Sequence, residues 1–479
     1  MYEKEKDLID AFLRGQMSRR SLIRGLGALG MTTATASVLL NASATRALAQ
    51  DFDWKQHQGK SLKLLLNKHP YTDAMIANLD NFKELSGMEV TYDIFPEDVY
   101  FDKVTAALSS RSSEYDAFMT GAYMTWNYGP AGWIVDHNEW IQDPTKTNPN
   151  YNWDDMLEGV RKSCAWNGVP GGALGSDDAK QWCIPWGYEQ NNLTYNAEML
   201  EKAGVDVPTS MDELITAAAQ AQANSDDGVY GIGVRGSRSW ATIHPGFLSA
   251  YANLGQHDLN VDNGKLSAAM NTDGSKDFHA KWVKMIQESG AADWSTHTWY
   301  QVGTDLGAGK SAMIYDADIL GYFMNGGDNA MAGKLAFAPF AASGQGEPTP
   351  NIWIWSLAMS NFSKDKDAAW NFIQWASGPE HGLFGAAEMD FVNPVRQSVW
   401  DDPTFRDRLA SGYPGYVNMH DVSAPGASIK FTPQPLFFDL TTEWAASLQK
   451  MVANEVPVDE GLDQLADSVN RQLKDAGLG

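Results

Sequence analysis

Short apolar strands alternate with helical patterns in the part of the chain that follows residue 60, and this order constrains the fold more than any other feature. Strands are predicted over residues 61–67, 88–94 and 115–119, because each run is apolar or alternating and ends in polar residues or Pro. Apolar residues recur at helical spacing over residues 75–82 and 99–108. A β-α-β-α-β order predicts a parallel sheet with helices on its faces.

Polar and aromatic side chains follow two of these strands at the point where each strand ends. Ligands of open α/β sheets bind outside the carboxyl ends of the strands. One rim of the first sheet is therefore expected to carry Asn67, His69, Tyr71, Thr120 and Tyr123.

The stretch Ile184–Asn196 starts apolar and aromatic, passes through four consecutive polar residues and leads into a helical pattern. On a strand, Trp186 and Tyr188 share a face because they lie two residues apart, and Glu189 stands at the turning point. These residues suit a hinge that leaves one sheet, enters another and is lined with binding groups. The alternative is an ordinary buried strand with a polar exit.

Two further strands are predicted over residues 309–316 and 351–359. The strand over 309–316 carries candidate binding residues at its carboxyl end. The strand over 351–359 carries two tryptophans on one face. This second strand is therefore another candidate for a crossing between sheets. These residues are Tyr315 and Asp316 on the first strand, and Trp353 and Trp355 on the second.

The segment Gly231–Gly236 matches the pattern G-x-G-x-x-G. A dinucleotide site needs a strand before this pattern and a helix that opens within it. Here residues 224–228 read as a loop, and the match itself falls in a predicted strand, so the pattern does not favour a nucleotide site. Arg235, at the end of that strand, is a candidate hydrogen-bond donor beside Trp240 and His244.

The chain has 479 residues, a length that predicts two or three domains with ample core. Its formal net charge of −24 argues against nucleic acid and against an anionic membrane surface as partners.

The first 49 residues read as a signal peptide of the twin-arginine (Tat) type. A twin-arginine motif, Ser18–Ile23, precedes an apolar run of small residues over 26–40, and Ala47-Leu48-Ala49 forms a cleavage site. This apolar run is too short and too rich in Ala, Gly and Thr to span a membrane. Export by the Tat translocase, cleavage after Ala49 and a periplasmic location follow as predictions.

Two cysteines remain, Cys164 and Cys183, and their spacing fits no zinc motif. In an oxidising compartment they either form one disulfide or stay as two buried thiols, and the sequence leaves both possibilities open.

Several segments, in this order, resemble the family of extracellular solute-binding proteins of ABC importers, in the sugar-binding group that includes maltose-binding protein. The resemblance covers nearly all of residues 60–475, and the export signal agrees with it. The segments that carry it are residues 117–133, 193–204, 208–214, 309–313, 368–375 and 394–396.

The resemblance implies a two-lobed α/β fold, the periplasmic-binding-protein fold of type II, in which each lobe is a mainly parallel sheet flanked by helices and a crossover hinge joins the lobes. After the signal peptide, it implies that each lobe is assembled from two segments. These are residues 50–190 and 355–428 for the N-terminal lobe, and residues 191–354 and 429–479 for the C-terminal lobe.

The resemblance also implies a binding site between the lobes. The rim of the first lobe, the two crossovers and the second lobe would contribute the candidates named above, and Arg396 would return to the first lobe's cleft. At the first-strand loop, where the maltodextrin-binding pattern has a carboxylate, this chain has Lys68-His69, which argues against maltose as the ligand.

A carbohydrate fits the chemistry of these residues, because a sugar has an apolar ring face and a rim of hydroxyls. Trp and Tyr supply flat apolar platforms with a polar handle. Glu189, Asp316 and Arg235 would form charge-assisted hydrogen bonds to hydroxyls. The predicted protein is a monomeric receptor that needs no cofactor, closes on a sugar, polyol or glycoside and delivers it to permease subunits in the inner membrane. The charge of the ligand is open, because Arg235, Arg396 and His69 would also suit an acidic sugar.

The alternative function is a Tat-exported enzyme. A cofactor-dependent oxidoreductase would need a cofactor motif, and the glycine pattern is the only candidate for one. A glycosidase would need two carboxylates about 5–10 Å apart across a cleft, for which Glu189 and Asp316 are conceivable.

Overall fold

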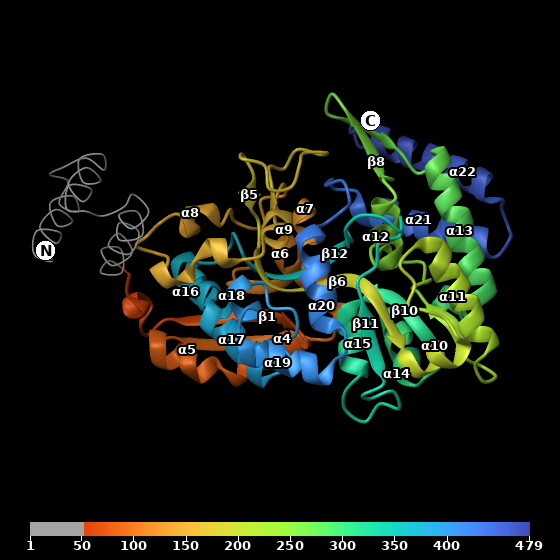
Figure 1. Ribbon diagram of the computed structural model, residues 1–479. Helices are drawn as coiled ribbons and strands as arrows, with labels where there is room; N and C mark the ends of the chain where they lie inside the picture. The colour runs from red at the N-terminus through yellow and green to blue at the C-terminus, as the bar shows by residue number, and fades with distance from the viewer. Residues whose placement is uncertain (1–51) are drawn as a thin grey trace, which may run out of the picture.

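The fold is built around β6 (Ile184–Asn196), a long strand that runs from one half of the molecule into the other (Figure 1). The computed structural model describes residues 52–479, so the predicted signal peptide lies outside the described residues. Residues 184–190 of β6 pair with β12 (Ile352–Met359). Residues 191–196 pair with strands of the other half. As predicted, this stretch leaves one sheet region and enters another.

One sheet holds eight strands in the order β2-β1-β3-β12-β6-β10-β7, with β11 also paired to β6. We call the part built on β1, β2, β3, β12 and the start of β6 the first lobe, and the part built on the end of β6 with β7, β10 and β11 the second lobe. Besides β6 and β12, the strands of this sheet are β1 (Ser61–Asn67), β2 (Glu89–Phe95), β3 (Ala117–Gly121), β7 (Tyr230–Gly233), β10 (Ser311–Ala317) and β11 (Leu335–Ala338). Two hairpins lie outside it, β4 (Ala165–Trp166) with β5 (Lys180–Gln181) and β8 (Leu259–Asp262) with β9 (Lys265–Ala268).

Each lobe contains neighbouring strands that run parallel, whereas the two strands that cross between the lobes run in opposite directions. β1 is parallel to both β2 and β3, which confirms the β-α-β-α-β prediction, and β7 is parallel to β10. β6 leaves the first lobe and β12 returns to it, so these two strands pair antiparallel. The two crossings therefore lie side by side in the centre of the sheet.

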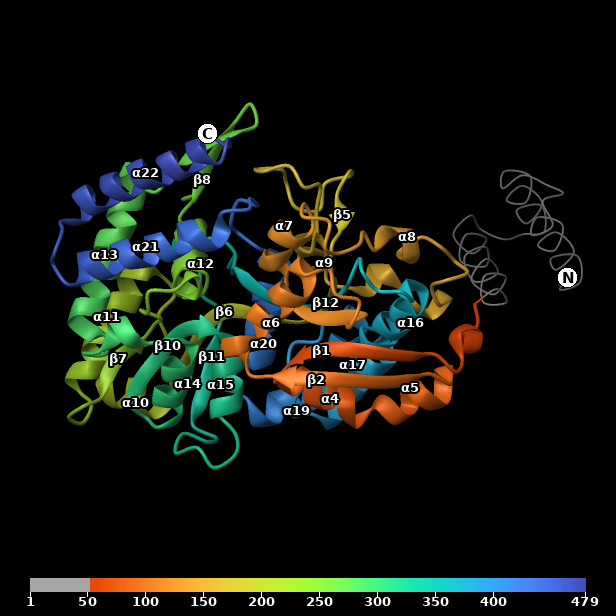
Figure 2. The same cartoon turned by 180° about the vertical axis from the view of Figure 1, so that it is seen from behind.

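Helices cover the faces of both lobes (Figures 1 and 2). Those of the first lobe are α4 (Pro70–Ala77), α5 (Leu79–Ser86), α6 (Glu97–Ser109), α7 (Thr125–Tyr128), α8 (Asn138–Ile141), α9 (Glu158–Ser163), α16 (Lys366–Ala376), α17 (Pro379–Glu388), α18 (Gln397–Trp400) and α19 (Pro403–Gly412). Those of the second lobe are α10 (Ala197–Ala203), α11 (Met211–Ala223), α12 (Gly246–Asn253), α13 (Asp273–Ser289), α14 (Trp299–Gly307), α15 (Asp318–Met324), α21 (Phe437–Val452) and α22 (Val458–Asp475). Helix α20 (Tyr416–Ser423) lies between the two groups, near the centre of the molecule (Figure 1).

In helix α22, the spacing of the apolar residues along the sequence determines which face of the helix is buried. Its predicted apolar face is buried as expected, at Leu462, Leu465, Ala466, Val469 and Leu473. This face packs toward α21 and α13, and the polar residues between these positions face water. Across residues 52–479, none of the helices combines the length and the apolar character that a bilayer crossing requires.

A close approach on β6 requires a glycine at position 187. The ring of Tyr71 lies directly over the Gly187 backbone, and a Cβ built at this position would lie 2.0 Å from Cε2 of Tyr71. The Tyr71 hydroxyl is anchored, because it donates a hydrogen bond of 2.7 Å to the carbonyl of Val392. The ring therefore has little freedom to give way to a side chain at position 187.

We predict that Gly187→Ala lowers the free energy of unfolding by about 1–3 kcal/mol, because the added methyl overpacks a buried contact. Urea denaturation of the two proteins measures the difference. Gly412→Ala is the matched control, since a Cβ at Gly412 meets no atom within 4 Å, and we expect a change within about 0.5 kcal/mol. Equal stability of Gly187→Ala and the unmodified protein would contradict this packing.

Candidate functional site

Aromatic rings from both lobes converge on Trp353. Tyr123 of the first lobe and Trp240 of the second both stack on its indole, with ring centroids 5.6 Å and 5.2 Å away. Phe437, at the start of α21, stacks in turn on Tyr123 at 4.6 Å. Trp353 is only 4% exposed. The rings thus form a continuous stack between the lobes, buried except at Trp240, which is partly exposed.

Strand register brings a carboxylate to this stack. Trp353 is the antiparallel partner of Glu189, and Trp355 is the partner of Gly187. Because paired residues of antiparallel strands lie on the same face of a sheet, Glu189 and both tryptophans share a face. The Trp355 indole Nε1 donates a hydrogen bond of 2.9 Å to Oε1 of Glu189.

The Glu189 carboxylate lies in an unusual electrostatic environment. It is buried, and the Trp355 indole is the only side chain between residues 52 and 479 that hydrogen-bonds to it. Burial raises the pKa of Glu189 to about 8, although the charge of Arg235 acts in the opposite direction. The carboxylates of Glu97 and Asp318 raise this pKa further. Burial therefore favours a protonated Glu189 near neutral pH.

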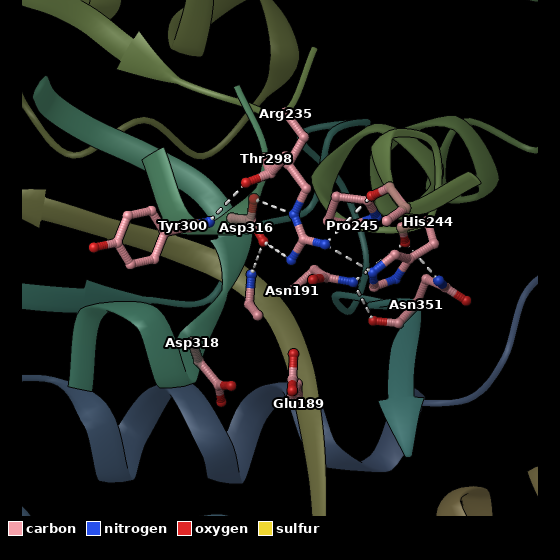
Figure 3. Close-up of polar contacts among 12 residues, drawn as sticks. Glu189, Asn191, Arg235, His244, Pro245, Thr298, Tyr300, Asp316, Asp318 and Asn351 are labelled. Atoms are coloured by element: carbon pink, nitrogen blue, oxygen red, sulfur yellow. Dashed lines mark hydrogen bonds and ion pairs between the residues drawn. The ribbon is translucent and has the colours of Figure 1, made fainter. Parts of the chain in front are cut away.

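Arg235 and Asp316 form a buried bidentate ion pair in the second lobe (Figure 3). Nε of Arg235 donates to Oδ2 of Asp316 at 2.9 Å, and Nη2 donates to Oδ1 at 2.7 Å. The side chains are 5% and 0% exposed. The pair occupies both oxygens of Asp316 and two of the three guanidinium nitrogens, so Arg235 is held in place by its counter-ion.

His244 is oriented by the same arginine. Nη1 of Arg235 lies 3.2 Å from Nε2 of His244. An arginine only donates, so Nε2 must accept, and the ring carries its proton on Nδ1. Burial, followed by the charge of Arg235, holds the pKa of His244 well below its usual value, which keeps the ring neutral.

Several buried polar atoms near the stack have no hydrogen-bond partner among the described residues. They include Nε1 of Trp353 and Nδ1 of His244. Both polar atoms of the Asn67 side-chain amide, at the end of β1, also lack a partner among these residues. A buried polar group without a partner costs roughly 1–3 kcal/mol. A small molecule with hydroxyl groups and an apolar side would supply partners to such atoms and pack against the rings.

Eight predicted site residues are linked into one group, which we call the interlobe cluster, and His244 provides the link between Arg235 and Trp240. His69 lies 5.1 Å from the Trp355 ring, and Trp240 stacks on His244 beside Arg235. Burial lowers the pKa of His69 to about 3, so this ring is neutral. The eight are His69, Tyr123, Glu189, Arg235, Trp240, Asp316, Trp353 and Trp355.

The two remaining candidates on β6 lie outside this cluster. The Tyr188 hydroxyl is 2.9 Å from Nε2 of His420, so this side chain faces α20. Trp186 contacts Tyr71 and Phe391, with ring centroids 6.2 Å away in both cases. Tyr188 is next to Glu189 on β6, so its side chain points to the other face of the sheet, and Trp186 lies where the β6–β12 register is irregular.

Other candidates are held within their own lobes. Nε of Arg396 donates to the carbonyl of Ser377 at 2.7 Å, and its guanidinium lies over the Tyr151 ring in the first lobe. Tyr315 packs against Phe340 in the second lobe, with ring centroids 4.8 Å apart.

The candidates on the rim of the first lobe differ in whether their polar groups are already bound within the protein. The Thr120 hydroxyl donates to the carbonyl of Gly121 at 3.3 Å, which leaves it engaged with its own strand. Tyr71 touches the edge of the cluster through His69, 4.4 Å away, but its hydroxyl is bound to backbone carbonyls. Asn67 stays a candidate because its amide has no partner among residues 52–479.

Sequence reasoning missed three residues at the cluster, and it named a fourth, His244, beside Arg235 without choosing it as a site residue. Phe101 of α6 stacks on Trp355, Phe437 stacks on Tyr123, and His244 contacts Arg235. Asn351 receives a hydrogen bond from the Tyr123 hydroxyl and donates one of 2.6 Å to the His244 carbonyl. The adjacent aromatic pair Phe437-Phe438 and the closeness of His244 to Arg235 in the chain were the available signals.

The glycine pattern at 231–236 has a packing explanation. A Cβ at Gly231 would lie 2.0 Å from the Ala218 carbonyl oxygen, and one at Gly236 would lie 2.1 Å from the Trp294 carbonyl oxygen. These glycines let α11 and the Trp294 segment approach the β7 region, which agrees with the sequence argument against a nucleotide site.

The cysteines and metal ligands give no further site. Cys164 and Cys183 are free and buried, and Sγ of Cys164 lies 3.5 Å from the Ser356 hydroxyl oxygen. In the described part of the chain, no group of three or more His, Cys, Asp or Glu residues is arranged to hold a metal ion.

Comparison with known proteins gives a consistent match. The sequence profile of the bacterial extracellular solute-binding protein family matches residues 68–382. An erythritol/L-threitol-binding protein of Mycolicibacterium smegmatis is 37% identical over 454 residues, which is 92% of this chain and 94% of the relative.

Solved structures share the fold. An ABC transporter solute-binding protein of Agrobacterium vitis S4 with bound D-mannitol has a TM-score of 0.69 at 21% identity, over 88% of this chain and 99% of that chain. Maltose-bound MalE3 of T. maritima has a TM-score of 0.72 at 16% identity, over 87% and 100%. The predicted two-lobed α/β fold is confirmed by these matches.

Removing one partner of the buried ion pair should destabilise the protein more than replacing both partners. We expect Arg235→Met to lower the free energy of unfolding by about 3–5 kcal/mol, because it leaves the Asp316 carboxylate buried without its partner. The double variant Arg235→Met/Asp316→Leu should recover most of this loss. Arg406→Met breaks an exposed pair with Asp421 and should cost no more than about 1 kcal/mol. Urea denaturation measures all three, and a double variant as unstable as the single one would contradict the prediction.

Proposed function

This chain belongs to the family of bacterial extracellular solute-binding proteins, and on that premise we propose that it captures a small neutral polyol between its two lobes for an ABC importer. The observation that carries the proposal is the interlobe cluster, where aromatic rings and hydrogen-bonding groups from both lobes meet at Trp353. The ligand class is supported by the Mycolicibacterium smegmatis relative, whose ligands are the tetritols erythritol and L-threitol.

The charges around the cluster support a neutral ligand rather than an acidic one. Arg235 is neutralised by Asp316, and Arg396 is engaged by carbonyls of the first lobe. His69 carries no positive charge, because burial lowers its pKa to about 3. An anion would therefore meet Glu189 without a free cation to pair with, and a charge buried without a partner is strongly unfavourable.

The family match favours a receptor over the exported enzyme, since members of this family bind solutes for transporters and are not enzymes. The geometry agrees with this. A glycosidase needs two carboxylates that are free to act as acid, base or nucleophile. Asp316 is instead bound through both oxygens to Arg235.

We further propose that residues 1–49 are a Tat signal peptide, cleaved after Ala49, and that the mature protein works as a monomer in the periplasm. For the mature chain we keep the expected division into residues 50–190 and 355–428 in one lobe and 191–354 and 429–479 in the other. The change of β6 partners after residue 190 supports the first of these boundaries.

We expect the mature protein, from Gln50, to bind erythritol or L-threitol in isothermal titration calorimetry. Trp353→Ala should weaken this binding at least tenfold, because it removes the ring around which the stack is built. Trp54→Ala is the matched control, because Trp54 lies at the start of the described chain, outside the cluster. The affinity of this variant for the tetritol should equal that of the unmodified protein. Absence of tetritol binding, or equal loss in both variants, would count against the proposal.

The export pathway is tested in the full-length chain. We predict that the charge-conserving double substitution Arg19→Lys/Arg20→Lys leaves the precursor uncleaved in the cytoplasm, since the Tat pathway reads the arginine pair. Arg14→Lys/Arg24→Lys is the control and should be exported normally. Cell fractionation with immunoblotting separates precursor from mature protein, and full periplasmic processing of the first variant would exclude Tat export.

A further inference from the structure

We propose that the interlobe cluster also accepts a polyol that carries a protonated amine, with the Glu189 carboxylate as the partner of the ammonium group. The inference rests on the proposed function, because it places both ligand classes in the same site. It assigns Glu189 the task of selecting between a neutral and a cationic ligand.

The first ground is that Glu189 has no cationic partner. No Lys, Arg or His of residues 52–479 lies within ion-pair distance of its carboxylate. Arg235, whose charge reaches Glu189, is held by both oxygens of Asp316. A buried carboxylate of this kind is stabilised either by a proton or by a cation that a ligand brings.

The second ground is the aromatic surface beside the carboxylate. Trp353 lies opposite Glu189 in the strand register, and Trp355 donates to it. Phe101 stacks parallel to Trp355, with ring centroids 6.1 Å apart and an interplanar angle of 8°. Faces of Trp and Phe attract ammonium groups, and recognition of ligand cations by aromatic cages uses this attraction. An ammonium group at Glu189 would therefore meet both a counter-charge and ring faces.

The other charged groups around Glu189 act in both directions, with Arg235 opposed by two carboxylates. From the second lobe, Arg235 is paired with Asp316, and Asp318 adds a further carboxylate. From the first lobe, Glu97 adds another negative charge.

Three neutral groups complete the surroundings. Burial raises the pKa of Tyr71 well above its usual value, so its hydroxyl stays protonated. His69 and His244 are neutral, because burial lowers the pKa of each. The carboxylates of Glu97 and Asp318 favour a cation at Glu189, while the charge of Arg235 acts in the opposite direction.

The test compares a tetritol with its analogue in which an amine replaces one terminal hydroxyl, by isothermal titration calorimetry of the mature protein between pH 6.5 and 8.5. Burial raises the pKa of Glu189 to about 8, so without a cation beside it the carboxyl is mainly protonated at pH 6.5. With the amine bound, the carboxylate must be ionised. The ratio of amine affinity to tetritol affinity should therefore rise with pH, by about tenfold across this window.

The conservative variant Glu189→Gln separates charge from shape. Glutamine keeps an oxygen that can accept from the Trp355 indole but carries no charge, so the variant is judged by the ratio of amine affinity to tetritol affinity and not by tetritol affinity alone. Amine affinity should fall at least tenfold, and the pH dependence of the ratio should disappear. Asp421→Asn removes an exposed carboxylate outside the cluster and should change neither affinity.

The outcomes are distinct. Tetritol binding together with an affinity ratio that does not change with pH would overturn this inference and leave the proposed function intact. The same holds if the amine binds equally well to the unmodified protein and to Glu189→Gln. The ratio is measured in the unmodified protein, so the test does not depend on folding of the variant. If neither ligand binds, both the inference and the proposed function fail.

Discussion

The register between β6 and β12 is the constraint on which the rest of the site depends. It sets Trp353 opposite Glu189 and Trp355 opposite Gly187, so that two indoles and a carboxylate share one face at the point where the chain crosses between lobes. A slip by one residue would turn every side chain to the other face. Gly187 holds the register from the first lobe, because the Tyr71 ring occupies the space of a side chain there.

Much of this could be predicted from local patterns. A period of two residues identified β12 and its tryptophans, and the β-α-β-α-β order identified the parallel part of the sheet. The stretch 184–196 combined apolar, aromatic and polar residues in one strand, which is what a strand shared by two lobes requires. For the cluster, the sequence indicated Glu189 by its place at the turning point of this stretch, and Arg235 by its place at the end of a predicted strand.

The rest of the site depends on contacts between distant parts of the chain. The sequence predicts that Trp186 and Tyr188 share a face, but not that α20, with His420 located 232 residues after Tyr188, covers that face. The sequence predicts that Arg396 lines the cleft, but its guanidinium donates hydrogen bonds to carbonyls of the first lobe. Phe437 follows a stretch without clear periodicity, so nothing local indicates that it stacks on Tyr123.

The central claim is that ligand binds on the Glu189 face of β6 and not on the face covered by α20. A crystal structure of the mature protein with a bound tetritol tests it most directly. The account predicts a tetritol hydroxyl within hydrogen-bond distance of the Glu189 carboxyl group, and carbon atoms in contact with the Trp353 ring. Tetritol density between Tyr188 and α20, or at any position without contact to Trp353, would contradict it.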